Sequence, residues 1–229
     1  MLALRPNQKV LTLPGYGMGV LEAPVPAPWW EVAGKTCVAA YQPKGAASYA
    51  ASKVNLANPG TYNVTSGLGD PTWGATDGWQ FNGTQWLQTG VTATNSLTWL
   101  IRYANHGATT MGGIFGVEDT GNAQIVMYPN LYGMQFKSGG ALTILRPDDW
   151  AAGVGAASPE YGYWNGTSKG ALADPLSGST AHTIPIGANY GRVNDLYYTQ
   201  AVNILAFALY SATLTAEEIA TVSAAMAAL

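Results

Sequence analysis

The most constraining stretch of the chain is an apolar run near its C-terminus, residues 202–210 (VNILAFALY), in which only Asn203 is clearly polar. The run is too short to span a bilayer, and its apolar residues fall on both alternating faces. This pattern predicts a β-strand that is covered on both sides.

A helix is predicted directly after this strand. Thr215 and Glu218 have the spacing of a capping box, and Leu214 and Ile219 have the spacing of a hydrophobic staple. Apolar residues then recur at intervals of three and four, at Ile219, Val222, Met226 and Leu229. They form one stripe that must be buried, and the preceding strand is the nearest surface for it.

This order of strand, turn and capped helix resembles the closing segment of laminin-G-like, concanavalin A-like jelly-roll domains, in which the motif iY-x-x-x-L-S-x-E-E-I follows the last strand. The matching residues are Ile186-Gly187-Ala188-Asn189, Leu209-Tyr210 and Leu214-Thr215-Ala216-Glu217-Glu218-Ile219. The resemblance implies a scaffold, because this family includes lectins, glycanases, adhesion modules and virion proteins.

A second match is similar to laminin-G-like proteins encoded by phages and prophages, whose first long strand starts with a W-x-F-N-G-x-x-x-L hairpin. Here it corresponds to residues 79–87, and Asn82-Gly83 is a strong hairpin signal in its own right. Trp164-Asn165-Gly166 repeats this aromatic-Asn-Gly pattern at the position where the family has its y-v-N-G hairpin. The family's W-H-x-v-a strand is matched only by residues 149–154, without the histidine.

Alternating apolar residues predict further strands between these two hairpins. They are expected at residues 97–103, 112–117, 123–128, 132–137 and 142–146, joined as an antiparallel meander. Residues 181–187 are expected to lead into the closing motif, and residues 47–54 allow one short helical turn.

Length and composition favour one large all-β domain. The chain has 229 residues, of which only 10% are charged, with 28 Gly, 13 Pro, 8 Trp and 13 Tyr for turns and aromatic anchors. The predicted fold is an all-β, antiparallel β-sandwich of the concanavalin A-like or laminin-G-like jelly-roll type, at residues 29–229, with a short C-terminal helix. Residues 1–28 are predicted to be an extended, Pro-rich N-terminal arm that lies either on its own sandwich or on a neighbouring subunit.

Several partners and locations are not expected. The net charge of −3 comes without a basic stripe, so nothing indicates nucleic acid. No signal peptide or transmembrane segment is predicted, because Pro and Gly interrupt the N-terminal apolar residues. Cys37 is the only cysteine and is expected to be a buried apolar thiol.

The sequence does not predict an enzyme. Retaining glycanases on this scaffold place carboxylates about 5 Å apart on one strand, in an E-x-D-x-x-E pattern that this chain lacks. Glu118-Asp119 and Asp148-Asp149 are adjacent pairs, which point to opposite faces of a strand. His106 and His182 fall in no nucleophile or metal-binding motif and are expected to be structural or surface residues.

Two ligand sites are candidates. For glycans, Asp148, Asp149, Trp150, Tyr161, Tyr163 and Trp164 combine aromatic rings with hydrogen-bonding groups, although core packing is the competing role for each ring. No cofactor is predicted. Laminin-G-like and legume-lectin-like domains can hold calcium at the rim of the sandwich, and the candidate ligands for such an ion here are Glu118, Asp119 and Asn122. Turn formation is the competing role for these three residues.

The resemblance and the lack of catalytic groups lead to the hypothesis of a non-enzymatic phage or prophage virion protein, a decoration or structural part of a head, tail or fibre. Its expected location is the virion, its expected partners are other virion proteins contacted through residues 1–28, and contact with surface glycans and homo-oligomer formation are compatible with this role. The alternatives are a free-standing carbohydrate-binding lectin and, as the weaker one, a glycan-degrading enzyme.

Overall fold

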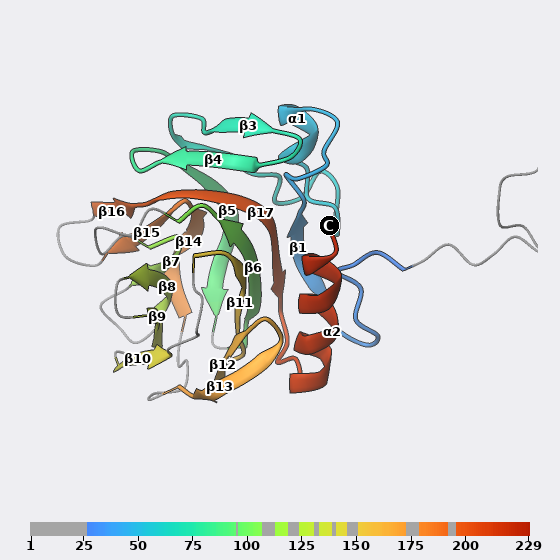
Figure 1. The fold of residues 1–229 in the computed structure, drawn as a ribbon, viewed down its shortest axis with the longest axis vertical. Coiled ribbons are helices and arrows are strands. Elements are labelled where there is room, and N and C mark those ends of the chain that lie inside the picture. The colour runs from blue at the N-terminus through green and yellow to red at the C-terminus, as the bar shows by residue number, and fades with distance from the viewer. Residues whose placement is uncertain are drawn as a thin grey trace, which may run out of the picture.

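The computed structural model describes residues 27–94, 96–106, 113–118, 124–130, 133–138, 141–145, 151–172, 179–191 and 196–229. Within these ranges two β-sheets pack face to face, and one longer helix lies along the outer side of the first sheet (Figure 1). This arrangement confirms the predicted antiparallel β-sandwich with a C-terminal helix.

Sheet A contains both the predicted core strand and the strand that begins at Trp79. Its order is β13-β12-β11-β6-β17-β4-β3, and β1 pairs with the far end of β17. The strands are β1 (Cys37–Tyr41), β3 (Thr72–Gly74), β4 (Gly78–Asn82), β6 (Thr98–Ala104), β11 (Gly153–Ala157), β12 (Tyr161–Trp164), β13 (Thr167–Ala171) and β17 (Ala201–Tyr210).

Sheet B faces the inner side of sheet A. Its order is β10-β9-β8-β7-β14-β5-β2, with β15 beside β7 and β16 beside β15. The strands are β2 (Thr65–Leu68), β5 (Trp86–Thr94), β7 (Phe115–Glu118), β8 (Gln124–Asn130), β9 (Gly133–Ser138), β10 (Ala141–Leu145), β14 (Ser179–Ile186), β15 (Ala188–Gly191) and β16 (Leu196–Thr199). The helices are α1 (Tyr49–Ser52), at the predicted helical turn, and α2 (Ala216–Ala227).

Strand β17 is covered on both faces, as its sequence predicts. Ile204, Phe207 and Leu209 belong to the core between the sheets, whereas Ala208 and Tyr210 belong to the cluster under α2. A bulge between Ile204 and Ala206 in the pairing with β6 shifts the alternation. Small alanines on the outer face let the helix approach the sheet closely.

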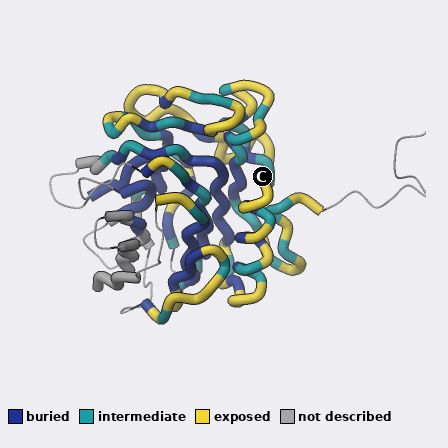
Figure 2. Tube along the Cα trace, in the orientation of Figure 1, coloured by how far each residue is buried: buried dark blue, intermediate teal, exposed yellow. Residues whose placement is uncertain are grey.

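The predicted stripe of α2 closes this outer cluster. Ile219, Val222 and Met226 are buried against side chains of β6, β11, β12 and β17, and Leu229 is partly buried there. Burial of each such side chain stabilises the fold by about 2 kcal/mol, which a single amphipathic helix obtains only by docking. Figure 2 shows the resulting pattern, with buried residues concentrated in the strands and exposed residues in the turns.

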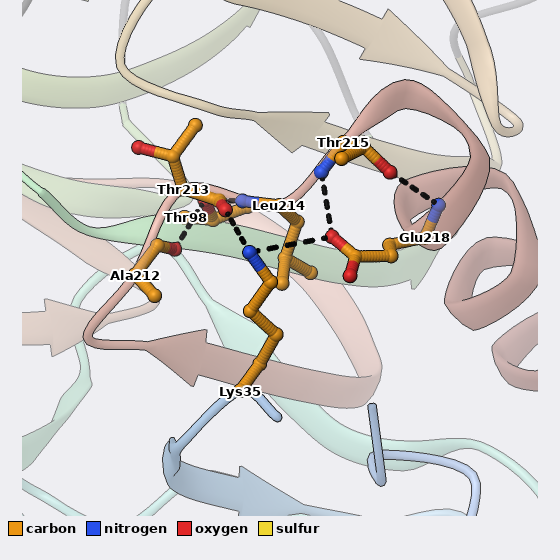
Figure 3. A network of polar contacts seen from close by, with 7 residues as sticks. All are labelled: Lys35, Thr98, Ala212, Thr213, Leu214, Thr215 and Glu218. Atoms are coloured by element: carbon orange, nitrogen blue, oxygen red, sulfur yellow. Dashed lines mark hydrogen bonds and ion pairs between the residues drawn. The ribbon is translucent and has the colours of Figure 1, made fainter. Parts of the chain in front are cut away.

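Polar contacts fix the start of α2 on sheet A (Figure 3). Thr215 Oγ1 accepts from Glu218 N at 3.2 Å and Glu218 Oε2 accepts from Thr215 N at 2.7 Å, which confirms the capping box. Thr98 of β6 donates to Ala212 O at 2.8 Å and accepts from Leu214 N at 3.0 Å. Lys35 Nζ donates to Thr213 O at 3.0 Å and lies 3.8 Å from Glu218.

The two Asn-Gly pairs have different structures, and one prediction is wrong. Asn165 (φ 49°) and Gly166 (φ 78°) both have positive φ and join β12 to β13 in the predicted hairpin. Asn82-Gly83 instead links β4 of sheet A to β5 of sheet B, so these strands do not pair. There only Gly83 has positive φ (89°), and Asn82 Oδ1 accepts from Thr84 N at 3.0 Å in an Asx turn.

The predicted meander is confirmed for β7, β8, β9 and β10, which pair in that order. Its predicted first strand is an exception, because β6 lies in sheet A beside β11 and β17. The division at residue 28 remains a prediction, since residues 1–26 lie outside the described part. No helix in the described ranges is both long and apolar enough to cross a bilayer.

Candidate functional site

Several residues of the two predicted sites lie outside the described part of the chain. They are Asp148, Asp149 and Trp150 of the glycan set, and Asp119 and Asn122 of the calcium set. Glu118 is the last residue of β7, and only its backbone is described. Across the described ranges, no group of three or more His, Cys, Asp or Glu side chains is placed to hold a metal ion.

Strand β12 carries the other three predicted glycan-binding residues, and it separates them. Tyr163 (4% exposed) lies under α2, and Trp164 (6% exposed) lies between the sheets, 5.8 Å from the Tyr103 ring. These two rings are core residues and cannot form the exposed platform that the sequence predicted, because alternation along β12 points them at two covered faces. Tyr161 is 43% exposed on the same strand.

The outer face of sheet B presents a different set of aromatic and amide side chains. Along β5, Leu87, Thr89, Val91 and Ala93 are buried, so Trp86, Gln88, Gly90 and Thr92 point to the opposite side. Thr65 of β2 pairs with Gln88 and therefore lies on that side too. We call this surface the β2–β5 face, defined by Tyr62, Thr65, Gly67, Trp86, Gln88, Gly90 and Thr92.

The half-buried Trp86 packs directly on the backbone of β2. A Cβ atom built at Gly67 would lie 1.9 Å from Trp86 Nε1 and 2.2 Å from its Cδ1, so only glycine leaves room for this ring. Gly67 also falls in a bulge of β2, where the register to β5 shifts between Ser66 and Leu68. The bulged glycine therefore determines where the indole lies.

Tyr62 lies at the other end of the face, against β5. A Cβ atom built at Gly90 would be 3.4 Å from Tyr62 Cδ1, and Gly90 has φ +75°. Tyr62 itself has φ 58° and is 42% exposed, and its backbone carbonyl accepts a hydrogen bond from the buried Tyr41 hydroxyl. A bulky residue in the left-handed region is strained and persists only where its surroundings hold it.

Asn55 holds the loop that carries Tyr62. Its buried Oδ1 accepts from Ala40 N and Ala57 N at 2.9 and 3.1 Å, and its Nδ2 donates to Val38 O and Thr61 O at 2.9 Å each. Every hydrogen-bonding position of this amide is used. The loop is consequently tied to β1, and the Tyr62 ring is placed by a rigid support.

Gln88 occupies the centre of the face. Its Nε2 donates to Thr183 O at 3.2 Å and also to Thr183 Oγ1, which joins β5 to β14 and fixes the orientation of the amide. Its Oε1 is enclosed by neighbouring atoms and has no hydrogen-bond partner among the described residues. A ligand hydroxyl would reach this acceptor only after a small side-chain movement.

The β2–β5 face carries no charge at neutral pH, since none of its seven defining residues is Asp, Glu, Lys, Arg or His. Amides, hydroxyls and aromatic rings are the groups that a neutral polyhydroxylated ligand needs for hydrogen bonding and stacking. A charged ligand would find no partner among these residues for its ionic group.

Among the described residues, hollows also lie elsewhere on the surface. One, of about 360 Å³, lies between residues 31–33 and the first turn of α2 and is lined in part by Glu31, Glu217 and Glu218. Glu218 there is already engaged by its cap and by Lys35. Another, of about 280 Å³, is lined by Gln42 and by small and apolar residues around α1.

Two residues with catalytic potential are placed as structural groups. Cys37 packs in the cluster under α2, and burial raises the pKa of its thiol to about 12, which favours the neutral form. His106 lies beside the Tyr103 ring, 6.3 Å between centroids, and burial lowers its pKa to about 4. Cys37 thus lies on the α2 side of sheet A, whereas His106 lies beside Tyr103 of the core between the sheets.

The class that this fold defines is the antiparallel β-sandwich, a fold that is also found as a domain of larger proteins. Domain 4 of AbnA, a GH43 extracellular arabinanase from Geobacillus stearothermophilus solved in complex with arabinotriose, is similar with a TM-score of 0.55 and 15% identity. The match covers 82% of this chain and 98% of that domain.

Two further similar structures are larger than this chain. Trypanosoma rangeli sialidase has a TM-score of 0.55 at 14% identity, over 81% of this chain and 32% of the sialidase. The botulinum neurotoxin serotype D binding domain has a TM-score of 0.52 at 14% identity, over 82% of this chain and 50% of that domain. This chain thus spans about a third and a half of their lengths, and at these identities the likeness shows the fold alone.

Sequence comparison does not assign this chain to a family. No protein-family model matches the chain, and no curated protein matches it. The laminin-G-like resemblance therefore stands on the motifs quoted above, and the β-sandwich stands on the structure.

Proposed function

We propose that this protein is a non-enzymatic, glycan-binding β-sandwich module that binds its ligand on the β2–β5 face. The observation that carries the proposal is the pair of aromatic side chains on this face, Tyr62 and Trp86, each seated against a glycine of a neighbouring strand with Gln88 between them. Aromatic rings held in this way can stack on sugar rings with little loss of side-chain entropy on binding.

The non-enzymatic part of the proposal is supported by the surroundings of Cys37 and His106. Burial shifts the pKa of each toward its neutral form, and the two lie in separate parts of the core. Neither group belongs to the β2–β5 face. A binding role needs only the shape and hydrogen bonds of that face.

The decisive experiment compares two tyrosines of nearly equal exposure on different sheets. Tyr62 is 42% exposed on the β2–β5 face and Tyr161 is 43% exposed on β12. Purified protein is first screened on a glycan array, and the ligand found is measured by calorimetry with Tyr62→Ala and Tyr161→Ala. We expect Tyr62→Ala to weaken binding about tenfold, because a stacked aromatic contributes on the order of 1–2 kcal/mol, and Tyr161→Ala to change little.

The reverse result would assign binding to the site predicted from the sequence around Tyr161. An array that stays silent both with and without Ca²⁺ would contradict glycan binding altogether. The same measurements with EDTA test the predicted calcium site, because loss of binding on chelation would require a metal.

A second reading concerns where such a module acts. Its motifs resemble phage and prophage laminin-G-like proteins, and we extend the proposal to a structural or decoration protein of a phage or prophage virion, attached to other virion proteins through residues 1–28. Mass spectrometry of purified particles tests this role. Presence of the protein at a fixed ratio to the coat protein is expected, and its absence from the particles would contradict the virion role but leave glycan binding intact.

A further inference from the structure

We infer that the β2–β5 face takes a linear, uncharged oligosaccharide long enough to reach both aromatic side chains at once, and that it discriminates against single sugars and anionic glycans. This inference rests on the proposed function and specifies its ligand. Three features support it: the distance between the two aromatic rings, the absence of charged residues on the face, and the rigid packing that holds each ring.

The spacing of the two rings follows from β5, which carries Trp86 and against which Tyr62 packs. Trp86 is on β5, and Tyr62 lies against Gly90 of the same strand, four residues further on. At the rise of an extended strand this separates the two ends of the face by about 13 Å. A single sugar ring is too short for that distance, whereas a trisaccharide or a longer chain lying along β5 can contact both rings.

The side chains between the two rings favour a linear ligand. Thr65 and Gln88 are cross-strand partners, and Gln88 is fixed by Thr183 of β14. They supply hydroxyl and amide groups across the middle of the face, where the central units of a chain would lie. Gly67 and Gly90 bring no side chains of their own, which lets the Trp86 and Tyr62 rings lie close to the sheet at the two ends of the face.

Charge distinguishes the ligand class. The seven residues of the face are uncharged, so an anionic sugar would lose hydration of its carboxylate or sulfate without gaining an ionic partner there. Binding of a neutral chain should also be nearly independent of salt, because no ion pair is screened.

Both rings are held before a ligand arrives. Trp86 cannot move toward β2 because the backbone of Gly67 is there, and the Tyr62 loop is tied down by the buried Asn55. Two fixed anchors act together only on a ligand that spans them, so affinity should rise steeply at one chain length.

The test is a length series measured by calorimetry. The probes are neutral linear oligosaccharides of arabinose, xylose, glucose and mannose, each from the monosaccharide to the hexasaccharide, together with sialylated and sulfated oligosaccharides. We expect at least about a tenfold rise in affinity between the disaccharide and the tetrasaccharide of the preferred sugar, with little change between about 0.05 M and about 0.5 M salt. Anionic probes should bind at least about tenfold more weakly.

Three variants assign the length dependence to the two rings. Tyr62→Ala and Gly67→Ala, the second of which displaces Trp86, should each make the hexasaccharide bind no better than the disaccharide binds to the unchanged protein. Tyr161→Ala is the matched control and should keep the full length dependence. Thermal unfolding of each variant checks that the fold is retained.

Different outcomes separate the two proposals. If no probe binds and the glycan array is silent, the proposed function fails. If monosaccharides bind as well as hexasaccharides, or if anionic glycans bind best, the protein still binds glycans but this inference is overturned. Length dependence that survives in Tyr62→Ala and Gly67→Ala would also overturn it, because the ligand would then lie elsewhere.

Discussion

At the residue scale, the most heavily bonded buried side chain described above is Asn55, whose amide bonds to four backbone groups, two in β1 and two in the loop that carries Tyr62. The Asn55 amide gives these backbone groups the hydrogen-bond partners that a neighbouring strand would otherwise supply. Its identity as an amide matters more than its size.

Replacing Asn55 by the isosteric aspartate should therefore be severe. Asn55→Asp turns the donor Nδ2 into an oxygen that faces Val38 O and Thr61 O, and we expect the free energy of unfolding to fall by about 3 kcal/mol or more. Urea denaturation followed by tryptophan fluorescence measures it. Asn82→Asp is the control, since Asn82 is exposed and its Oδ1 only accepts, from Thr84. Equal effects of the two changes would contradict this account of Asn55.

His106 provides a pH-dependent prediction at the same scale. Burial lowers its pKa from 6.5 to about 4, so between these values the unfolded chain binds the proton and the folded chain does not. Stability should therefore fall as the pH drops from 6.5 to 4, and the residue should contribute no pH dependence above that range.

The effect of His106 should be on the order of 2 kcal/mol, less than the full pKa difference implies, because the ring is not completely shielded from solvent. Denaturation curves of the unchanged protein and of His106→Phe are recorded at intervals from pH 7 to pH 4. Their difference separates the contribution of His106 from that of the carboxylates, which both proteins share. Between pH 6.5 and pH 4 the unchanged protein should lose about 2 kcal/mol more stability than His106→Phe loses. Parallel profiles would show that His106 does not titrate on unfolding.

At the scale of elements, the features best predicted from the sequence are those determined by neighbouring residues. The capping box, the staple and the apolar stripe of α2 all depend on contacts within a few residues, and the structure confirms them. The hairpin at Asn165-Gly166 was predictable for the same reason. Asn82-Gly83 has the same local signal, but β17 and β14 supply the partners of β4 and β5, so tertiary pairing overrides it.

The β2–β5 face shows the same limit for the candidate site. The alternation of Trp86 with Leu87 indicates that one of them points outward, but the sequence does not show which sheet carries the strand. Tyr62 packs against Gly90 and Trp86 packs against Gly67. No local sequence pattern connects either aromatic residue with its glycine. Tyr163 and Trp164 had the richer local pattern, and both are core residues.

The start of α2 allows a quantitative test at this scale. Thr215→Ala removes the acceptor for Glu218 N and should lower the free energy of unfolding by about 1 kcal/mol, with faster amide hydrogen exchange in the first turn. Thr221→Ala is the matched control, since the exposed Thr221 hydroxyl only donates to Glu217 O within the helix. Its effect should stay within about 0.5 kcal/mol. An equal loss in both variants would refute a specific role of the cap.

At the scale of the whole molecule, the fold joins the two ends of the described chain. β1 pairs with β17, so that Cys37 lies opposite Tyr210 and Tyr41 opposite Phe207, and the Tyr210 hydroxyl donates to Trp30 O at 2.9 Å. These pairings close a loop of about 170 residues between Cys37 and Tyr210. Contacts of such long sequence separation carry a large entropic cost of loop closure.

This topology predicts slow folding. After dilution from urea, the main refolding phase followed by stopped-flow tryptophan fluorescence should fall between about a millisecond and a few seconds, as for other sandwiches rich in non-local contacts. The rate should not depend on protein concentration, which excludes aggregation as its cause. A main phase in the microsecond range would show that local contacts dominate the transition state.

The antiparallel pairing of β1 with β17 also has a mechanical consequence. The start of β1 and the end of β17 meet at one end of the ladder, because Cys37 is paired with Tyr210. Tension applied between the two termini would therefore load the hydrogen-bonded pairs one after another, like a zipper, rather than shearing them together. A pull transmitted from the N-terminal side to a ligand on β5 would load the same ladder, beginning at the Cys37–Tyr210 pair, because β17 is the strand to which β1 is paired in the described part of the chain.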